Sequence, residues 1–275
     1  MNPWLETAAV ITVVLSGIIA GKIFSGFRRP YWIIGYSLPL VLIAILVASR
    51  WSDSFTFVPP FYWLIAGRIR FIVLSLAVTI GLTTPLSRLP YKFEKIIICV
   101  LMTIVVVWFS VLPFLVPALI RDGLSKANTI VNIDGICFQS RDYTCGPAAA
   151  VTALRILGLS AEEGEIAILS HASPMTGTLP SCLCDALQER YGEEGLKCRY
   201  RRFDDIGQLK NAGLTLAVVR DAFLSDHCVV VLDVSDRKVT IADPVFGRLS
   251  MPHKQFEKIW RFSGIVLSCG PKRNT

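Results

Sequence analysis

Residues 145–157 read CGPAAAVTALRIL, and this stretch predicts a helix that begins at a cysteine. Ala and Leu favour the helix, Pro147 falls in its first turn, where a missing backbone N–H costs nothing, and Gly158 follows its end. Cys145 therefore stands where free N–H groups and the positive end of the helix dipole favour the thiolate, the nucleophilic form of cysteine. Taken alone, the same position also suits a buried structural cysteine.

His227 is the residue best placed to act as a base toward this thiol. It opens the run His-Cys-Val-Val-Val-Leu, which predicts a strand. A strand end lies at the rim of a sheet, so an imidazole there can take the thiol proton and later protonate a leaving amine. Of the other two histidines, His171 lies in a polar loop and His253 follows Pro252. A surface position is favoured for both.

Asp243 ends the next predicted strand, 239–242, and precedes a proline. A turn at 235–238 pairs this strand antiparallel with the one that follows His227, so the carboxylate should lie beside the imidazole. A carboxylate in that place holds the ring and stabilises the imidazolium, as in a Cys-His-acid triad. An Asp before proline is also a common turn former, and the two interpretations are compatible.

Gln139 lies six residues before Cys145, at the end of a short apolar stretch. Its side-chain amide can join the backbone N–H of Cys145 in holding a developing oxyanion. By itself, Gln139 would be an ordinary polar loop residue.

The remainder of the second half predicts an α+β domain. Ser160 and Glu163 form a capping box that opens a second helix, and a third helix over 179–191 ends at Gly192. Short apolar or alternating runs then predict strands over 214–219, 228–234, 239–242 and 265–268. Helices followed by strands favour a fold in which helices pack on an antiparallel sheet.

The first half predicts an all-α transmembrane block of about four helices. Its apolar runs, the first interrupted only by Lys22, cover 7–27, 31–49, 71–87 and 96–120. Roughly 20 apolar residues cross a bilayer, and Pro113 and Pro117 should kink or end the fourth helix. Buried core helices are the alternative, but they leave too little polar surface for a soluble fold.

We therefore divide the chain into a transmembrane region 1–120, a polar linker 121–132 and a soluble domain 133–275. The charged residues are distributed according to this division. Residues 1–120 contain nine Lys and Arg and three Asp and Glu, against nineteen and eighteen in residues 121–275. The folded domain is nearly neutral, so nucleic-acid binding is not expected. No CxxC pair or Cys/His zinc spacing occurs, so neither a metal nor a cofactor is expected.

Basic residues also indicate how the predicted spans are oriented. The first and third connections between spans carry Lys22, Arg28, Arg29, Arg88, Lys92 and Lys95. The positive-inside rule favours a cytoplasmic place for these connections. Four spans then put the soluble domain on the extracytoplasmic side of a bacterial cell membrane. The margin is small, because the second connection carries Arg50, Arg68 and Arg70.

Five short motifs in the second half resemble the bacteriocin-processing, double-glycine cysteine peptidases. These are the papain-like domains at the head of peptidase-containing ABC exporters. The motifs are QSRDYTCGPA from Gln139, GT from Gly177, HCVVV from His227, DPVFG from Asp243 and FEKIW from Phe256. The resemblance covers about residues 133–269 and implies a papain-like fold. It also implies Cys145 as nucleophile, His227 as base, Asp243 as orienting acid and Gln139 as oxyanion donor.

Two departures from that family limit what the resemblance implies. The residue before the family's cysteine is usually acidic, whereas this chain has Thr144. The sequence also contains no GxxxxGK[ST] phosphate-binding loop. We therefore expect a membrane-anchored form without the exporter modules, with a separate transporter as a partner of the kind the family implies.

The sequence thus predicts an integral, multi-pass cysteine peptidase that hydrolyses a peptide or protein substrate at the lipid bilayer. The family implies cleavage after Gly-Gly of a leader peptide. The alternatives are a non-catalytic peptide-binding or regulatory domain on a membrane anchor, and an amidase or acyltransferase with the same chemistry.

Overall fold

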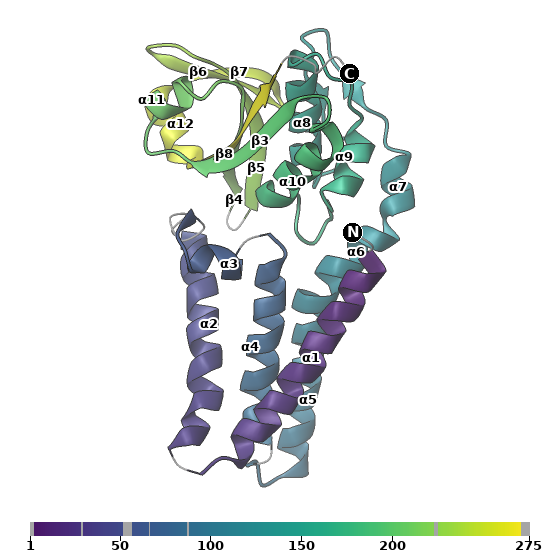
Figure 1. Cartoon of the computed structure of the whole chain (residues 1–275), viewed down its shortest axis with the longest axis vertical. Helices are drawn as coiled ribbons and strands as arrows, with labels where there is room; N and C mark the ends of the chain where they lie inside the picture. Colours follow the sequence, from purple (N-terminus) through teal and green to yellow (C-terminus); the bar gives the residue numbers. More distant parts are fainter. Residues whose placement is uncertain are drawn as a thin grey trace. The chain divides into compact units, whose positions relative to one another are not determined.

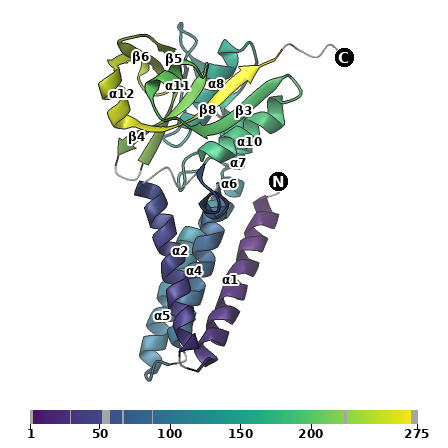
Figure 2. The same ribbon diagram turned by 60° about the vertical axis from the view of Figure 1, so that its left-hand side comes forward.

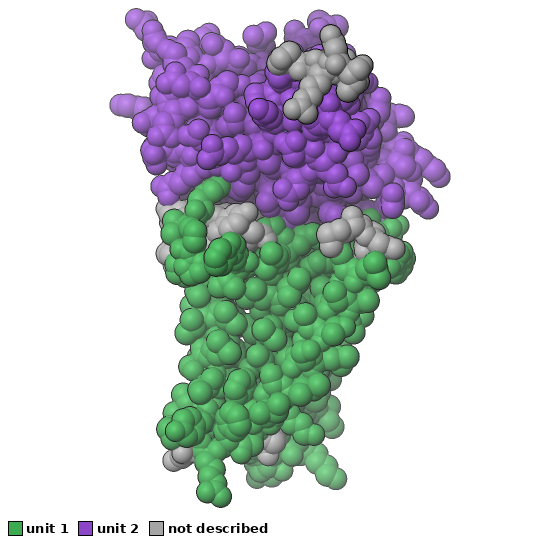
Figure 3. Space-filling model, in the orientation of Figure 1, with its two compact units in different colours: residues 1–119 green, residues 120–275 purple. Residues whose placement is uncertain are grey.

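The computed structural model describes residues 3–28, 30–51, 57–65, 67–86, 88–222 and 225–270. Arg29, Ser87 and the C-terminal residues 271–275, which the sequence predictions include, lie outside these ranges. The chain forms two compact units, Met1–Leu119 and Ile120–Thr275, which Figure 3 colours separately. Residues 121–132, predicted as a linker, belong to the second unit and contain a short helix and a short strand.

The first unit is a block of apolar helices that lie side by side (Figures 1 and 2). Its elements are α1 (Pro3–Gly26), the 3₁₀ turn η1 (Tyr31–Ile33), α2 (Ile34–Trp51), α3 (Phe61–Ile65), α4 (Ile69–Leu86), α5 (Lys92–Val106), the π turn η3 (Val107–Val111) and α6 (Leu112–Leu119). Four helical segments are long and apolar enough to cross a membrane: Trp4–Gly26, Tyr31–Ser49, Ile69–Leu86 and Lys92–Leu119. They coincide with the four apolar runs of the sequence.

The fourth segment departs from regular α-helix near its prolines, as the sequence predicts. The π turn η3 lies immediately before Pro113, and the N–H of Leu112 donates to the carbonyl of Val107, five residues back. Proline has no N–H to give to the carbonyl four residues before it, and its ring crowds that carbonyl. A local π turn relieves this crowding while the helix continues. The segment then runs through Pro117 and ends at Leu119.

Small residues allow α1 and α4 to approach each other closely. Gly17 and Gly21 lie one turn apart on α1 and face Thr79 and Thr83 of α4. The hydroxyl of Thr79 donates to the Ser75 carbonyl at 2.7 Å, so this polar group is satisfied within its own helix. Spacings of this small-xxx-small kind bring the backbones of apolar helices into contact, where van der Waals packing holds them.

A charged pair joins α1 to the residue that precedes α4. Arg68 makes an ion pair with Glu6 of α1 and donates to the Pro113 carbonyl at 3.2 Å. Its guanidinium also lies 4.2 Å from the centre of the Phe114 ring. Because both charged side chains are largely buried, each depends on the other for compensation.

The second unit begins with α7 (Arg121–Ser125) and a two-stranded sheet of β1 (Ile130–Val131) and β2 (Cys137–Phe138). Three helices follow: α8 (Cys145–Ile156), α9 (Glu163–Leu169) and α10 (Pro180–Tyr191). The remaining elements are β3 (Leu196–Arg202), α11 (Ile206–Lys210), β4 (Thr215–Ala222), β5 (Ser225–Val234), β6 (Lys238–Asp243), β7 (Gly247–Pro252), α12 (His253–Ile259) and β8 (Trp260–Cys269). Six of these strands form one antiparallel sheet in the order β3-β8-β4-β5-β6-β7.

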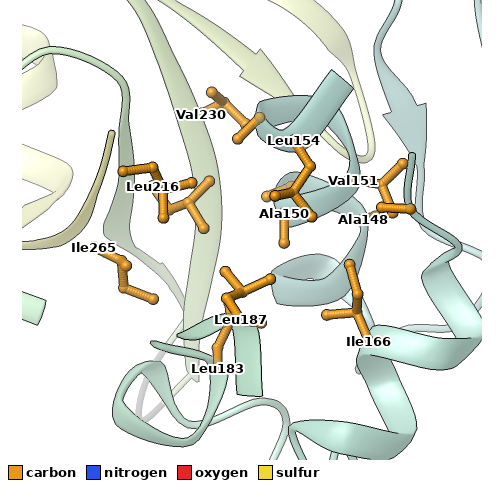
Figure 4. Close-up of a cluster of buried hydrophobic side chains, with 14 of the residues drawn as sticks. Ala148, Ala150, Val151, Leu154, Ile166, Leu183, Leu187, Leu216, Val230 and Ile265 are labelled. Carbon is orange, nitrogen blue, oxygen red and sulfur yellow. The ribbon is translucent and has the colours of Figure 1, made fainter. Parts of the chain in front are cut away.

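Both faces of this sheet are covered, because side chains alternate along each strand. Leu216, Val230 and Ile265 point to one face, where they meet apolar side chains of α8, α9 and α10 (Figure 4). Their strand neighbours Ala217 and Val229 belong to a second core on the other face. That core includes side chains of α11 and α12, which lie across the sheet from α8 and α10 (Figures 1 and 2).

The predicted α+β class, with helices packed on an antiparallel sheet, is confirmed. The hairpin of β5 and β6 is also found, with Val230 opposite Ala242 and Val234 opposite Val239. The capping box was wrong: α9 begins at Glu163 after the N-cap residue Glu162, and the Glu163 side chain is fully buried. The strands predicted from apolar runs do not include β3, because its alternating basic residues mask an edge strand.

Replacing Gly21 by Leu should destabilise the helix block by about 1–3 kcal/mol, the usual cost of overpacking. A Cβ at this position would lie 2.8 Å from Thr83 Cβ and 3.0 Å from the Ile80 carbonyl oxygen. Thermal unfolding of the detergent-solubilised full chain measures the loss. Gly26→Leu is the matched control, because a Cβ there meets nothing within 4 Å. Equal unfolding temperatures for the two variants would contradict this account of α1 and α4.

Candidate active site

Cys145 is the first residue of α8, as the sequence predicts. The helix itself is nearly all buried, so its first turn is held rigidly against the sheet. Gly146 is needed next to it, because a Cβ at this position would lie 3.0 Å from the Thr178 Cβ. The Cys145 side chain is half-buried, which leaves the sulfur partly accessible while its backbone is fixed.

Thr144 directly precedes Cys145, and its side chain closes the loop before the helix. The side chain is buried; its hydroxyl donates to the Arg141 carbonyl at 2.9 Å and accepts the Arg141 N–H at 3.1 Å. The Thr144 N–H also donates to the Arg141 carbonyl at 3.1 Å. A neutral hydroxyl therefore fixes the turn that leads into Cys145.

His227 is the third residue of β5 and lies beside both Cys145 and Asp243. Its Nε2 atom is 3.1 Å from Oδ1 of Asp243, and the Cys145 side chain lies close enough to raise the pKa of the imidazole. Because Nε2 faces the carboxylate, Nδ1 is the ring nitrogen that remains for the thiol. The pairing of β5 with β6 accounts for this contact: extending the Val230–Ala242 register places Asp243 diagonally across from His227.

Asp243 is the last residue of β6, and its carboxylate is largely buried. Oδ1 accepts the N–H of Val245 at 2.7 Å and that of Phe246 at 3.3 Å, in addition to its contact with His227. Asp243 therefore both forms the turn after β6 and contacts the imidazole. Burial alone would raise the pKa of this carboxyl, but His227 and the two backbone N–H groups hold it below its usual value.

Electrostatics favour a charged imidazole at this site. Burial lowers the pKa of His227, but the hydrogen bonds and charges of Asp243 and Cys145 outweigh burial and raise the pKa to about 10. The neighbouring thiol of Cys228 behaves differently, because burial raises its pKa well above the usual value. The imidazolium therefore faces Cys145, whereas Cys228 stays a neutral thiol.

Gln139 follows β2 and is tied to the same region through its backbone. Its N–H donates to the Pro244 carbonyl at 3.0 Å, next to Asp243 in the chain. Its side-chain Oε1 is buried and has no hydrogen-bond partner within the described ranges. The structure thus brings His227 into contact with Asp243, places Cys145 near the imidazole and fastens the Gln139 backbone to the residue after Asp243.

Two other residues singled out in the sequence take different positions from those predicted. His253 opens α12 rather than lying in a surface turn, and its Nε2 is 2.8 Å from the Ser235 carbonyl oxygen. Glu163, whose spacing from Ser160 predicted only a cap, accepts two hydrogen bonds from Ser140, the residue after Gln139. Across the residues that the structure describes, no three His, Cys, Asp or Glu side chains form a group that could hold a metal ion.

A helix-borne cysteine beside a strand-borne histidine and acid is the arrangement that papain-like cysteine peptidases use. Residues 135–274 match the model of the peptidase C39 family, and the chain belongs to that family. An uncharacterized protein of Methanothermobacter thermautotrophicus is 30% identical over 140 residues, or 51% of this chain and 91% of that protein. An uncharacterized protein of Methanothermobacter marburgensis is 33% identical over 129 residues, which make up 47% of this chain and 83% of that protein.

Solved structures of peptidase domains from ABC transporters are similar to the second unit. A double glycine motif protease from an AMS/PCAT transporter, in complex with the leader peptide, is 17% identical, with a TM-score of 0.43. The match covers 52% of this chain and 94% of that one. The peptidase domain of Streptococcus ComA, a bi-functional ABC transporter, is 20% identical, with a TM-score of 0.42; the match covers 48% and 96%.

Replacing Asp243 by Asn should destabilise the protein in a pH-dependent way. His227 has a pKa of about 10 in the folded chain against about 6.5 when unfolded, so the stability it adds is complete below about pH 6.5 and is lost toward pH 10. The lowered pKa of Asp243 adds stability that is lost only as the pH falls through the acid range. Asn still accepts the Val245 and Phe246 N–H groups, so the difference reports on the charge.

Thermal unfolding of the full chain in detergent, from about pH 5 to about pH 10, measures this effect. The gap between wild type and Asp243→Asn should be largest at the acidic end and shrink steadily toward pH 10. The exposed Asp233 on the neighbouring strand β5 supplies the control variant Asp233→Asn. A gap that stays constant from pH 6 to pH 10 would contradict the charged pair.

Proposed function

We propose that this chain is a membrane-anchored cysteine peptidase whose nucleophile is Cys145. The observation that carries the proposal is the 3.1 Å contact of the His227 imidazole with the Asp243 carboxylate, in a place where the Cys145 side chain also acts on the imidazole. A cysteine that served only to fill the core would need neither an imidazole near its sulfur nor a carboxylate hydrogen-bonded to that imidazole. Membership of the peptidase C39 family supports the same reaction.

The reaction proceeds in two halves. The Cys145 thiolate attacks the scissile carbonyl carbon, so that a C–S bond forms and the C=O electron pair moves onto oxygen. Collapse of this intermediate breaks the C–N bond, and His227 gives its proton to the leaving amine. Water then gives a proton to His227 and attacks the thioester, which expels the Cys145 thiolate and restores the imidazolium.

Gln139 is proposed to stabilise the oxyanion in both halves, together with the Cys145 backbone N–H. The buried atom of its amide is the acceptor Oε1, which leaves the donor Nε2 as the end available to a substrate. An oxyanion donor must be held still, because its benefit depends on pointing to the developing charge in advance. The hydrogen bond of the Gln139 N–H to Pro244 supports such a fixed position.

The substrate class we propose is a peptide with a leader that ends in Gly-Gly. Family membership and the five motifs of the sequence support it. The four apolar helical segments support an anchor in the membrane, with peptide delivered at the bilayer and a separate transporter as partner. The basic residues of the first and third connections favour an extracytoplasmic place for the peptidase domain of a bacterial cell membrane protein.

Alkylation by iodoacetamide near neutral pH tests the proposed nucleophile without a substrate. Cys145 should react faster than Cys182 and Cys269, which are also half-buried, because only Cys145 faces the His227 imidazolium. Peptide mass spectrometry of the full chain after timed alkylation gives each rate. His227→Ala should slow the reaction of Cys145, whereas His253→Ala should not. If Cys145 reacts no faster than Cys182, the catalytic role fails.

The proposed topology predicts which basic connections are accessible from outside a cell. A single cysteine placed near Arg50, in a chain whose native cysteines are replaced by serine, should react with a membrane-impermeant maleimide in intact cells. One placed near Lys92 should react only after the cells are opened. The reverse pattern would put the peptidase domain in the cytoplasm.

A further inference from the structure

Glu163 is a buried acid that the catalytic scheme leaves without a role. It opens α9 and has no solvent exposure. Burying a carboxylate is costly unless hydrogen bonds compensate it, so a buried acid in an apolar setting calls for an explanation beyond packing. Its neighbour Glu162, by contrast, is exposed and lies on the surface.

Glu163 contacts Ser140, the residue that follows the proposed oxyanion donor Gln139. Its Oε1 accepts the backbone N–H of Ser140 at 2.9 Å and the Ser140 hydroxyl at 3.1 Å. Its own N–H donates to the hydroxyl of Thr129 at 2.9 Å, which ties the start of α9 to the chain before β1. Two hydrogen bonds from one residue to the same carboxyl oxygen fix the position of Ser140.

Ser140 matters because it follows Gln139. The N–H of Gln139 donates to the Pro244 carbonyl, and the next N–H along the chain donates to Glu163. The peptide groups on both sides of the Gln139 Cα are therefore fixed by two separate parts of the fold. With its backbone held in this way, the Gln139 amide can move only through its own side-chain torsions.

We infer that Glu163 is a positioning residue for the oxyanion donor: through Ser140, it holds Gln139 where the amide meets the developing charge. Glu163 touches neither Cys145 nor His227 in the contacts described above, so it acts on the oxyanion and not on the thiolate. This inference rests on the proposed peptidase function, and it predicts that the two can be separated by experiment.

The test compares two reactions of the same full chain in detergent. Cleavage of a synthetic peptide whose leader ends in Gly-Gly needs the oxyanion donor, whereas displacement by iodoacetamide forms no oxyanion and needs only the thiolate. Glu163→Ala should lower kcat by about 10- to 100-fold with little change in KM, because a misplaced donor weakens binding of the transition state alone. The alkylation rate of Cys145 should stay at the wild-type value, and Glu162→Ala should cleave like wild type.

A double-mutant cycle distinguishes positioning from a general structural effect. Gln139→Ala alone should cost about 10²–10³ in kcat, and adding Glu163→Ala should then cost little more, since the donor it holds is gone. Independent losses that multiply in the double variant would overturn the inference. So would wild-type kcat in Glu163→Ala.

Loss of rapid Cys145 alkylation in Glu163→Ala would indicate that this variant does not fold. In that case Glu163→Asp tests the positioning role instead. Asp keeps the charge but is one methylene shorter, so it cannot make both bonds to Ser140 in place. Its kcat should fall with KM and Cys145 alkylation preserved, and an unchanged kcat would overturn the inference. If wild type alkylates rapidly at Cys145 but cleaves no such peptide, it is the proposed substrate that fails, and the positioning role with it.

Discussion

The antiparallel register between β5 and β6 is the constraint on which the candidate site depends. It sets Val230 opposite Ala242, and this pairing brings the start of one strand and the end of the other to the same edge of the sheet. His227 and Asp243 meet there at 3.1 Å. A slip of one residue would turn each side chain to the opposite face and break the contact. The apolar residues between them resist that slip, because both faces of the sheet are buried.

The helix that carries Cys145 is held to the same sheet by packing. α8 is buried along most of its length, and its Leu154 and Val151 contact the core that includes Val230 of β5 (Figure 4). The sulfur and the imidazole therefore belong to two rigid elements that share one core. Polar contacts fix the loops next to these elements: Thr144 closes the turn before the helix, and Asp243 fixes the turn after β6. The reacting groups are thus held by structure that forms before any substrate binds.

Local patterns in the sequence predicted the elements that bear the reacting groups. The helix start at Cys145, the hairpin that joins His227 to Asp243 and the four apolar helices all follow from periodicity, turn residues and length. The apolar runs that predicted the other strands did not include β3, and the sequence did not predict the buried position of Glu163. Charged residues on an edge strand hide its alternation, and an S-x-x-E spacing is the same whether the acid caps a helix or enters the core. Burial of a polar side chain depends on tertiary partners such as Ser140, which lie far away in the sequence.

The two units place different physical demands on one chain. The helix block is held by close approach of Gly17 and Gly21 to α4 and by the pair of Arg68 with Glu6. Such packing needs no hydrophobic effect and works where the surroundings are apolar. The second unit is an ordinary α+β core with a nearly neutral surface.

The most direct test of the central claim is to trap the covalent intermediate. The full chain is mixed with a peptide whose leader ends in Gly-Gly, quenched in acid within the first turnover and analysed by mass spectrometry. The account predicts that the leader is attached as a thioester to Cys145 in the wild type, and that Cys145→Ala yields neither this adduct nor cleaved peptide. Cleavage by Cys145→Ala, or attachment of the leader to any other residue, would contradict it.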